Sequence, residues 1–298
     1  MSANLFWRPI STVRHELEGY FRIPHDRPPR WLFVLTAYLD ESGQESKDYV
    51  FIAGFLGNDE QWKQFANDWK IGLGARHGLH MSRLRWAHPK KIEPLLKRLG
   101  PIPHNCGLEP LLGGVRVSDY DDLVKGTISE KLMAGYMTAL YPLVIQMLKV
   151  VPSDERVELV FESQDRYEAL VNSMLTNLCA VKDPHFFMSD GITPKLANWK
   201  FVPKSSTMLT QPADFFAYTA TQLYRDENSV KSRLCMPICP KGNKSTAIGA
   251  VMKRRTVRRT IELTHLFAGF QQLGIDLSPR TQEEREQFNE LIYRLVNS

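Results

Sequence analysis

Three acidic residues follow apolar segments at positions from which their carboxylates could meet. Asp40 ends the apolar run 31–39, Glu162 ends the run 157–161, and Asp214 lies in the first turn of an otherwise apolar helical segment. Side chains at strand ends project from a rigid scaffold into open sites. Carboxylates suit hard cations such as Mg²⁺ and Mn²⁺, and clustered carboxylates repel one another without a cation. The sequence therefore predicts a divalent metal site with Asp40, Glu162 and Asp214 as its ligands and catalytic residues.

Each of these acids also has a simpler interpretation. The sequence Asp-Glu-Ser-Gly at 40–43 is an excellent turn between two strands. Glu162 could be a solvated strand end, and Asp214 could complement the dipole of its helix. Strand alternation places Asp40 and its neighbour Glu41 on opposite faces, so only Asp40 is expected at the metal.

The surrounding pattern predicts an α/β fold with a mixed sheet and flanking helices. The runs 31–39 and 49–56 are expected to pair as an antiparallel hairpin, followed by an amphipathic helix that contains Trp62, Phe65 and Trp69. Further strands are expected at 115–117, 157–161 and 199–202, and further helices at 129–150, 165–178 and from 210 onwards.

Changes in composition and a proline-containing segment divide the chain of 298 residues into three parts. The polar, proline-containing segment 25–30 separates an N-terminal appendage, 1–30, from a core at 31–228. Residues 229–298 form a basic and helical C-terminal extension, which we expect to pack on the core.

Charge and cysteine usage suggest the compartment and the partners. The net charge of +5 is compatible with phosphate-bearing partners, and four scattered cysteines favour a reducing, cytoplasmic compartment. The first 23 residues lack the uninterrupted apolar core of a signal peptide. Because no stretch of membrane-spanning length is free of charge, we expect no membrane partner.

Three motifs give the chain a resemblance to a known family. They are YLDESG at 38–43, FIAGFL at 51–56, and Ser205-Ser206 followed by QPADFFAY at 211–218. In their order and content they resemble the bacterial domain-of-unknown-function 3800 family, which is grouped with the ribonuclease H-like superfamily. The resemblance spans about residues 32–224. It implies a mixed sheet opened by a hairpin, an acidic metal site and nuclease activity.

The family pattern assigns its first-strand acid to Asp40 and its late-helix acid to Asp214. Its middle acid is usually an aspartate after a strand, where this chain has Glu162, with Asp165 as a rival. The residues expected to support these ligands are Glu41, His80, Asp165, Ser206 and Gln211. His80 resembles a family histidine that could contact a phosphate or assist the metal, although a lone histidine is more often structural. We find no equivalent of the helix-borne glutamate of ribonuclease H.

Two weaker signals lie near the C-terminus. Cys235 and Cys239 are close enough to share a metal, but one pair without a second is a poor zinc signature. The densest charge lies in the run 253–259, which is expected either to follow a nucleic-acid backbone or to form a solvated face. Its cations are Lys253, Arg254, Arg255, Arg258 and Arg259.

The leading hypothesis is a Mg²⁺- or Mn²⁺-dependent phosphodiesterase that cuts RNA or DNA. Paired cations can activate water on one side of a phosphodiester and stabilise the leaving oxygen on the other, without an organic cofactor. The alternative is a non-catalytic module that binds nucleic acid or protein through the same fold. A third hypothesis is hydrolysis of another phosphate ester, because a carboxylate-bound metal does not define the bond that is cut.

Overall fold

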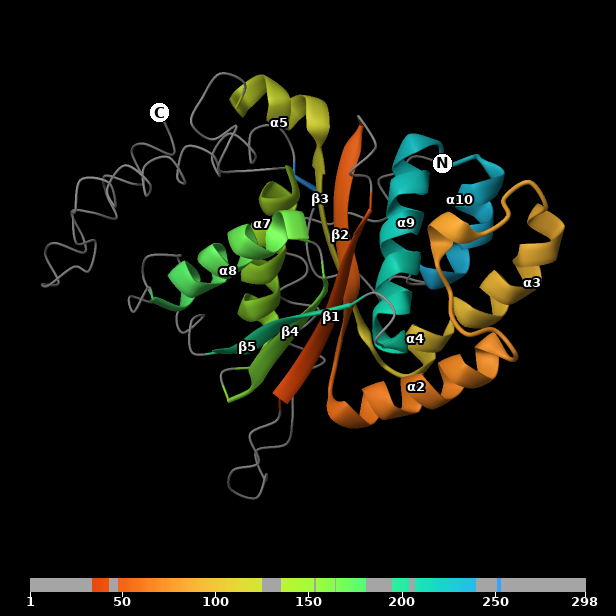
Figure 1. Ribbon diagram of the computed structural model, residues 1–298, viewed down its shortest axis with the longest axis horizontal. Helices are drawn as coiled ribbons and strands as arrows, with labels where there is room; N and C mark the ends of the chain where they lie inside the picture. Colours follow the sequence, from red (N-terminus) through yellow and green to blue (C-terminus); the bar gives the residue numbers. More distant parts are fainter. Residues whose placement is uncertain are drawn as a thin grey trace, which may run out of the picture.

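A mixed sheet with helices on both faces forms the centre of the protein (Figure 1). The computed structural model describes residues 34–42, 48–124, 135–152, 154–163, 165–180, 195–203, 207–239 and 251–252. Within them, six strands follow one another in the order β5-β4-β1-β2-β3-β6. The strands are β1 (Val34–Ser42), β2 (Tyr49–Gly57), β3 (Glu109–Arg116), β4 (Arg156–Glu162), β5 (Leu196–Val202) and β6 (Val251–Met252). The α/β class expected from the sequence is confirmed.

The first two strands form the antiparallel hairpin that the sequence predicts. Their register runs from the Thr36–Gly57 pair to the Ser42–Phe51 pair. Strand β1 ends later than expected, because it continues through Asp40 and Glu41 to Ser42. Asp40 is therefore a strand residue paired with Ala53, and the interpretation of residues 40–42 as a turn is wrong.

The later strands β4 and β5 extend the sheet in parallel from β1. Helix α7 (Gly135–Val150) precedes β4, and helix α8 (Asp165–Ala180) connects β4 with β5. Both contribute to one core cluster beneath the sheet, with Leu140 and Val171 fully buried in it. The Lys195 ammonium donates to the carbonyls of Leu148 and Val151, at 3.0 and 2.5 Å, and so satisfies the C-terminal end of α7.

Strand β3 differs from the expectation of a short strand at 115–117. It spans Glu109–Arg116, and Val117 begins helix α5 (Val117–Val124). Its Pro110, Gly113 and Gly114 lower the strand propensity of the segment. A Cβ atom on Gly113 would lie 2.5 Å from the carbonyl oxygen of Ala139, so glycine at this position lets α7 approach the strand closely.

The opposite face of the sheet carries an aromatic core. It is covered by α2 (Asp59–Leu73), α3 (Pro89–Leu99), α9 (Gln211–Arg225) and α10 (Val230–Cys235). Helix α2 begins with the predicted acidic first turn and is closed by a capping box between Asn58 and Gln61. Figure 1 shows α9 along β1 and β2, with α3 and α10 on its outer side. The short helix α4 (Ile102–Asn105) and the 3₁₀ turns η2 (Met81–Arg83), η5 (Met208–Thr210) and η6 (Met236–Ile238) complete this layer.

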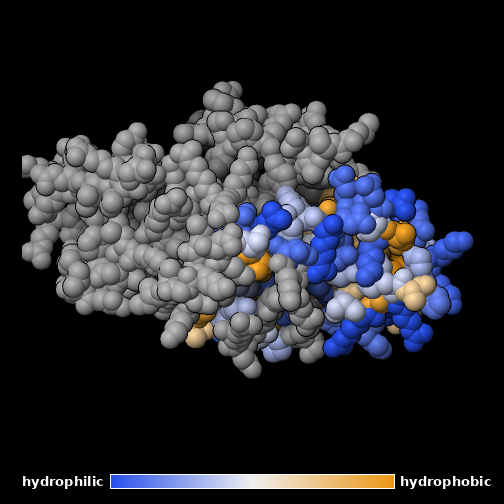
Figure 2. All heavy atoms as spheres, turned by 90° about the horizontal axis from the view of Figure 1, so that it is seen from above, coloured by the Kyte–Doolittle hydropathy of each residue, from blue (hydrophilic) through white to orange (hydrophobic). Residues whose placement is uncertain are grey.

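Part of the predicted C-terminal extension lies against the core. Cys235, Ile238 and Cys239 are buried in the aromatic cluster, and β6 pairs in parallel with β3. Residues 1–30 and 253–298 lie outside the described residues. In the described part of the chain, no helix has both the length and the apolar character needed to cross a membrane. The described surface seen in Figure 2 is mainly hydrophilic, with small separate hydrophobic areas.

The β1–β2 contact gives a first prediction. A Cβ atom on Gly54 would lie 1.9 Å from the backbone oxygen of Tyr38, so Gly54→Ala must displace β1 next to Asp40. We expect the free energy of unfolding to fall by about 2–3 kcal/mol or more. Urea denaturation followed by circular dichroism measures this loss.

The same substitution at Gly135 is the matched control. There a Cβ atom would meet Val50 and Val115 at 3.6 and 3.7 Å, which is ordinary contact. Because alanine also favours the helix, Gly135→Ala should stay within about 1 kcal/mol of the wild type. Equal losses in the two variants would contradict the predicted clash at Gly54.

Candidate active site

Two of the three predicted carboxylates lie side by side at one end of the sheet. Leu39 of β1 pairs with Phe161 of the parallel strand β4, and Asp40 and Glu162 are the residues that directly follow them. Neighbouring strands are separated by about 4.8 Å, and residues at the same level of parallel strands project from the same face. The parallel register therefore brings Asp40 and Glu162 together.

The face on which this pair lies follows from the core clusters. Leu39 and Phe161 belong to the cluster beneath α7 and α8. Ala53, the partner of Asp40 across the hairpin, belongs to the aromatic cluster on the other face. By alternation, Asp40 and Glu162 thus project on the face that α9 covers.

Both carboxylates are largely removed from solvent. Asp40 is 3% exposed and Glu162 is 7% exposed. One oxygen of Asp40, Oδ1, accepts a hydrogen bond of 2.8 Å from the backbone N–H of Glu41. The interpretation of Glu162 as a solvated strand end is therefore wrong. Two buried carboxylates on neighbouring strands offer oxygen ligands of the kind that a hard cation prefers.

A pair of tyrosines lies near this acidic end of the sheet, on the α7 side. The rings of Tyr136 and Tyr167 stack at 4.5 Å with an angle of 6° between them. Burial raises the pKa of Tyr136 well above its usual value, and the charges of Glu41 and then Asp40 raise it further. Tyr136 lies within the helix expected at 129–150, and it was not among the predicted site residues. The packing of α7 against β2 and β3 brings Tyr136 to this end of the sheet.

Asp214 has a different partner from the one predicted. It lies in the first turn of α9, half-buried, and its Oδ2 accepts a hydrogen bond of 2.9 Å from the backbone N–H of Met81. Its neighbour Gln211 is buried, and its Oε1 accepts from the Trp69 indole at 2.9 Å and from the Leu79 N–H at 3.0 Å. The QPAD sequence thus holds the segment that leads into η2.

The three predicted ligands do not form one metal-binding group. Among the residues that the structure describes, no three or more His, Cys, Asp or Glu side chains are grouped so that they could hold a metal ion. Asp40 and Glu162 alone still offer an oxygen-only donor set, which fits Mg²⁺ or Mn²⁺. Such ions commonly use one or two carboxylates and complete their coordination with substrate phosphates and water.

The remaining predicted residues are placed as follows. Glu41 pairs with Ile52 and faces the other side of the sheet from Asp40, as alternation predicts. His80 is half-buried and lies between the two residues that Gln211 and Asp214 bind. Three further predictions lie outside the described part: the side chain of Asp165, Ser206, and the basic residues Lys253, Arg254, Arg255, Arg258 and Arg259.

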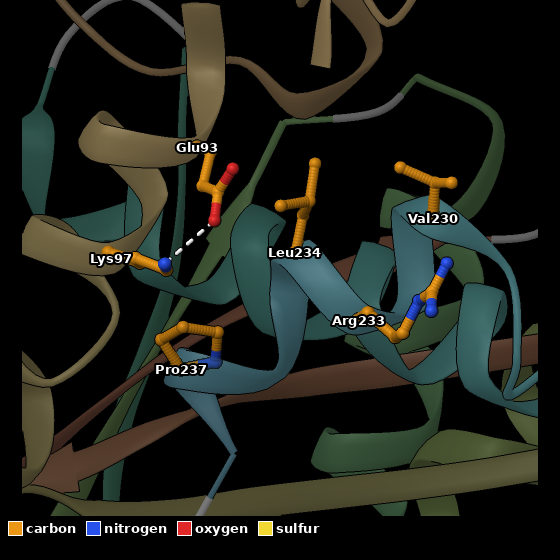
Figure 3. A pocket seen from close by; sticks show the side chains of 6 residues that line it. All are labelled: Glu93, Lys97, Val230, Arg233, Leu234 and Pro237. Carbon is orange, nitrogen blue, oxygen red and sulfur yellow. Dashed lines mark ion pairs between the residues drawn. The ribbon is translucent and has the colours of Figure 1, made fainter. Parts of the chain in front are cut away.

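The hollow between α3 and α10 is lined by none of the predicted site residues. Its volume is about 270 Å³, and Figure 3 shows its six lining side chains. The ion pair of Glu93 with Lys97 spans 2.7 Å along α3, and the wall from α10 and η6 includes Val230, Leu234 and Pro237. A second hollow lies at the start of α3 and is strongly basic.

Comparison with protein-family models, curated proteins and solved structures finds no match for this chain.

The hydrogen bonds of Gln211 give a stability prediction. Gln211→Met keeps a similar length but removes the acceptor, which leaves the Trp69 indole and the Leu79 N–H unsatisfied in a buried setting. Each unsatisfied group costs about 1–3 kcal/mol, so we expect the free energy of unfolding to fall by about 2 kcal/mol or more. Thermal unfolding measures the change. Gln222→Met, at a half-exposed position of the same helix, should leave stability almost unchanged; a comparable loss there would refute the assignment.

The four cysteines give a second test of the packing. All four thiols are free, and only Cys179 is exposed. Burial raises the pKa of Cys235 and of Cys239 to about 12, so both are protonated at neutral pH. In native protein at pH 7, we expect a thiol reagent to label Cys179 rapidly and the other cysteines only after unfolding. Rapid native labelling of Cys235 or Cys239 would contradict their burial.

Proposed function

We propose that the protein is a metal-dependent phosphodiesterase that cleaves RNA or DNA, and that its α/β fold is ribonuclease H-like. The single observation that carries this proposal is the placement of Asp40 and Glu162 at the same level of two neighbouring parallel strands. The mixed sheet opened by a hairpin is also the architecture that the motif resemblance implies.

In this proposal Asp40 and Glu162 hold Mg²⁺ or Mn²⁺ and present it to a phosphate of the substrate. When bound, the cation supplies Lewis acidity at the phosphorus and an activated water. The protein fixes the geometry, because both ligands lie on strands of one sheet and not on loops. Burial of the carboxylates strengthens their interaction with the cation, since the local dielectric constant is low.

Asp214 then acts indirectly. Its bond to the Met81 N–H fixes the segment beside α9, and that segment also contains His80. We propose that Asp214 and Gln211 are positioning residues, and that His80 lies where it could reach a bound phosphate. The four free thiols further suit the reducing, cytoplasmic compartment that we propose for the protein.

One observation favours the second candidate function, a module that binds nucleic acid without cutting it. Asp214 is engaged with backbone, and the described residues provide no third carboxylate or histidine in a metal-binding group. A single pair of carboxylates binds a cation more weakly than a larger cluster does. Cleavage assays distinguish the two candidates.

The cleavage prediction concerns the two paired carboxylates. Asp40→Asn and Glu162→Gln each remove a negative charge while keeping the size of the side chain, so each should lower Mn²⁺-dependent cleavage by about 100-fold or more. The measurement uses labelled single-stranded RNA, single-stranded DNA and duplexes, with Mn²⁺ or with a chelator.

Glu158→Gln is the matched control on the same strand. Glu158 lies two residues before Val160, away from the end of the strand. Its carboxylate forms an ion pair of 3.1 Å with the Lys200 ammonium. This variant should retain wild-type activity. Full activity in Asp40→Asn would refute the proposed site, and binding without any metal-dependent cleavage in the wild type would favour the second candidate.

A further inference from the structure

A basic pocket lies where the segment after α2 meets the start of α3. Its volume is about 410 Å³. The polar residues that line it are Arg76, Arg83, Arg85, His88 and Lys91. Among the described residues, Leu84 and Ile92 are its apolar lining residues, and no acidic residue lines it.

The positive charge of this pocket is not neutralised by neighbours. Within the part of the chain that the structure describes, no ion pair involves Arg76, Arg83, Arg85 or Lys91. The sequence also lacks Asp and Glu at every position from 69 to 92. Unpaired like charges in one hollow repel one another, and a polyanion relieves this repulsion.

The loop that presents the two central arginines is firmly held. Trp86, between Arg85 and His88, stacks on Tyr218 of α9 at 5.3 Å with an angle of 9° between the rings. Its indole donates to the Met81 carbonyl at 3.1 Å, and Lys231 lies 5.6 Å from its ring centre. Arg83 and Arg85 are thus exposed side chains on a preorganised loop.

The start of α3 adds to the positive potential. His88 is the N-cap of this 11-residue helix, and its side chain makes no capping hydrogen bond. The first turn also has no acidic residue. The N-terminal N–H groups of a helix carry partial positive charge, so the helix end and the surrounding cations both attract an anion.

We propose that this pocket binds phosphate groups of a nucleic-acid backbone. The arginine and lysine side chains that line it are hydrogen-bond donors only, which match phosphate oxygens. Among the described residues that line the pocket, none is a Phe, Tyr or Trp whose ring could stack a base, and none is an Asn, Gln, Asp or Glu that could read a base edge. The contact is therefore independent of base sequence.

The QPAD sequence at 211–214 holds the segment that leads into this pocket. Asp214 and Gln211 bind the backbone of Met81 and Leu79, directly before Arg83 and Arg85. One face of the N-terminal turn of α9 thereby fixes the phosphate-binding loop. The inference rests on the proposed function for the class of ligand, but it does not require cleavage.

The test is binding of fluorescein-labelled RNA and DNA oligonucleotides, measured by anisotropy with EDTA present and over a range of salt concentrations. Arg83→Ala/Arg85→Ala should weaken binding about tenfold or more at low salt, and it should reduce the slope of log K against log salt by about 2. The control Lys63→Ala/Lys97→Ala removes the same charge from two exposed lysines that pair with Asp59 and Glu93. It should change affinity by less than about threefold.

Four outcomes would overturn the proposal. Equal weakening in the two double variants would show that only net charge matters, and unchanged binding in the arginine variant would show that the pocket is not used. If only inorganic phosphate binds the wild type, the pocket holds free phosphate. If only vesicles that contain phosphatidylserine bind, the pocket is a lipid site.

Binding and cleavage can fail separately. If the arginine variant loses binding while Asp40→Asn still cleaves, the pocket stands and the proposed active site is wrong. If Asp40→Asn abolishes cleavage while the arginine variant binds and cleaves as the wild type does, the proposed function stands and the pocket is wrong. Circular dichroism of both double variants checks that they are folded.

Discussion

The parallel pairing of β1 with β4 is the constraint on which the candidate site depends. A hairpin could not create it, because strands joined by a tight turn are antiparallel. After β1 the chain forms β2, β3 and α7 in turn. Strand β4 follows them and pairs with β1. The last registered pair, Leu39 and Phe161, fills the core below, while the next residue on each strand is a carboxylate. The same pairing therefore stabilises the fold and brings two negative charges together.

The two faces of the sheet have different roles. The α7 and α8 face is mainly aliphatic and is closed at the acidic end by the stacked rings of Tyr136 and Tyr167. The α9 face is aromatic and carries polar anchors within it, most clearly the buried amide of Gln211. Buried polar groups in a satisfied network specify one arrangement of the elements around them. Helix α9 thus links the sheet to the outer layer formed by α2, α3 and α10.

Much of the sheet could be predicted because its signals are local. The alternation in β1 and β2, and the capping box at Asn58, depend on residues close together in sequence. Strand β3 was recognised only in part, since Gly113 reflects the close approach of Ala139 in a helix later in the chain. The partner of Asp214 is a backbone N–H without a side-chain signature, so its hydrogen bond was not predictable. The sequence signal of the basic pocket is the absence of Asp and Glu from 69 to 92, which is weaker than the dense run of cations at 253–259.

The hydrogen bonds of Gln211 and Asp214 also have a consequence for the order of assembly. They join residues separated by 132, 133 and 142 positions. During synthesis from the N-terminus, the segment around Met81 leaves the ribosome long before α9 exists. The arginine loop therefore cannot acquire its anchors until almost the entire sheet has been made. A nascent or truncated chain that lacks α9 has the cations of the pocket without the scaffold that aligns them, so ordered binding of a polyanion becomes a property of the completed domain.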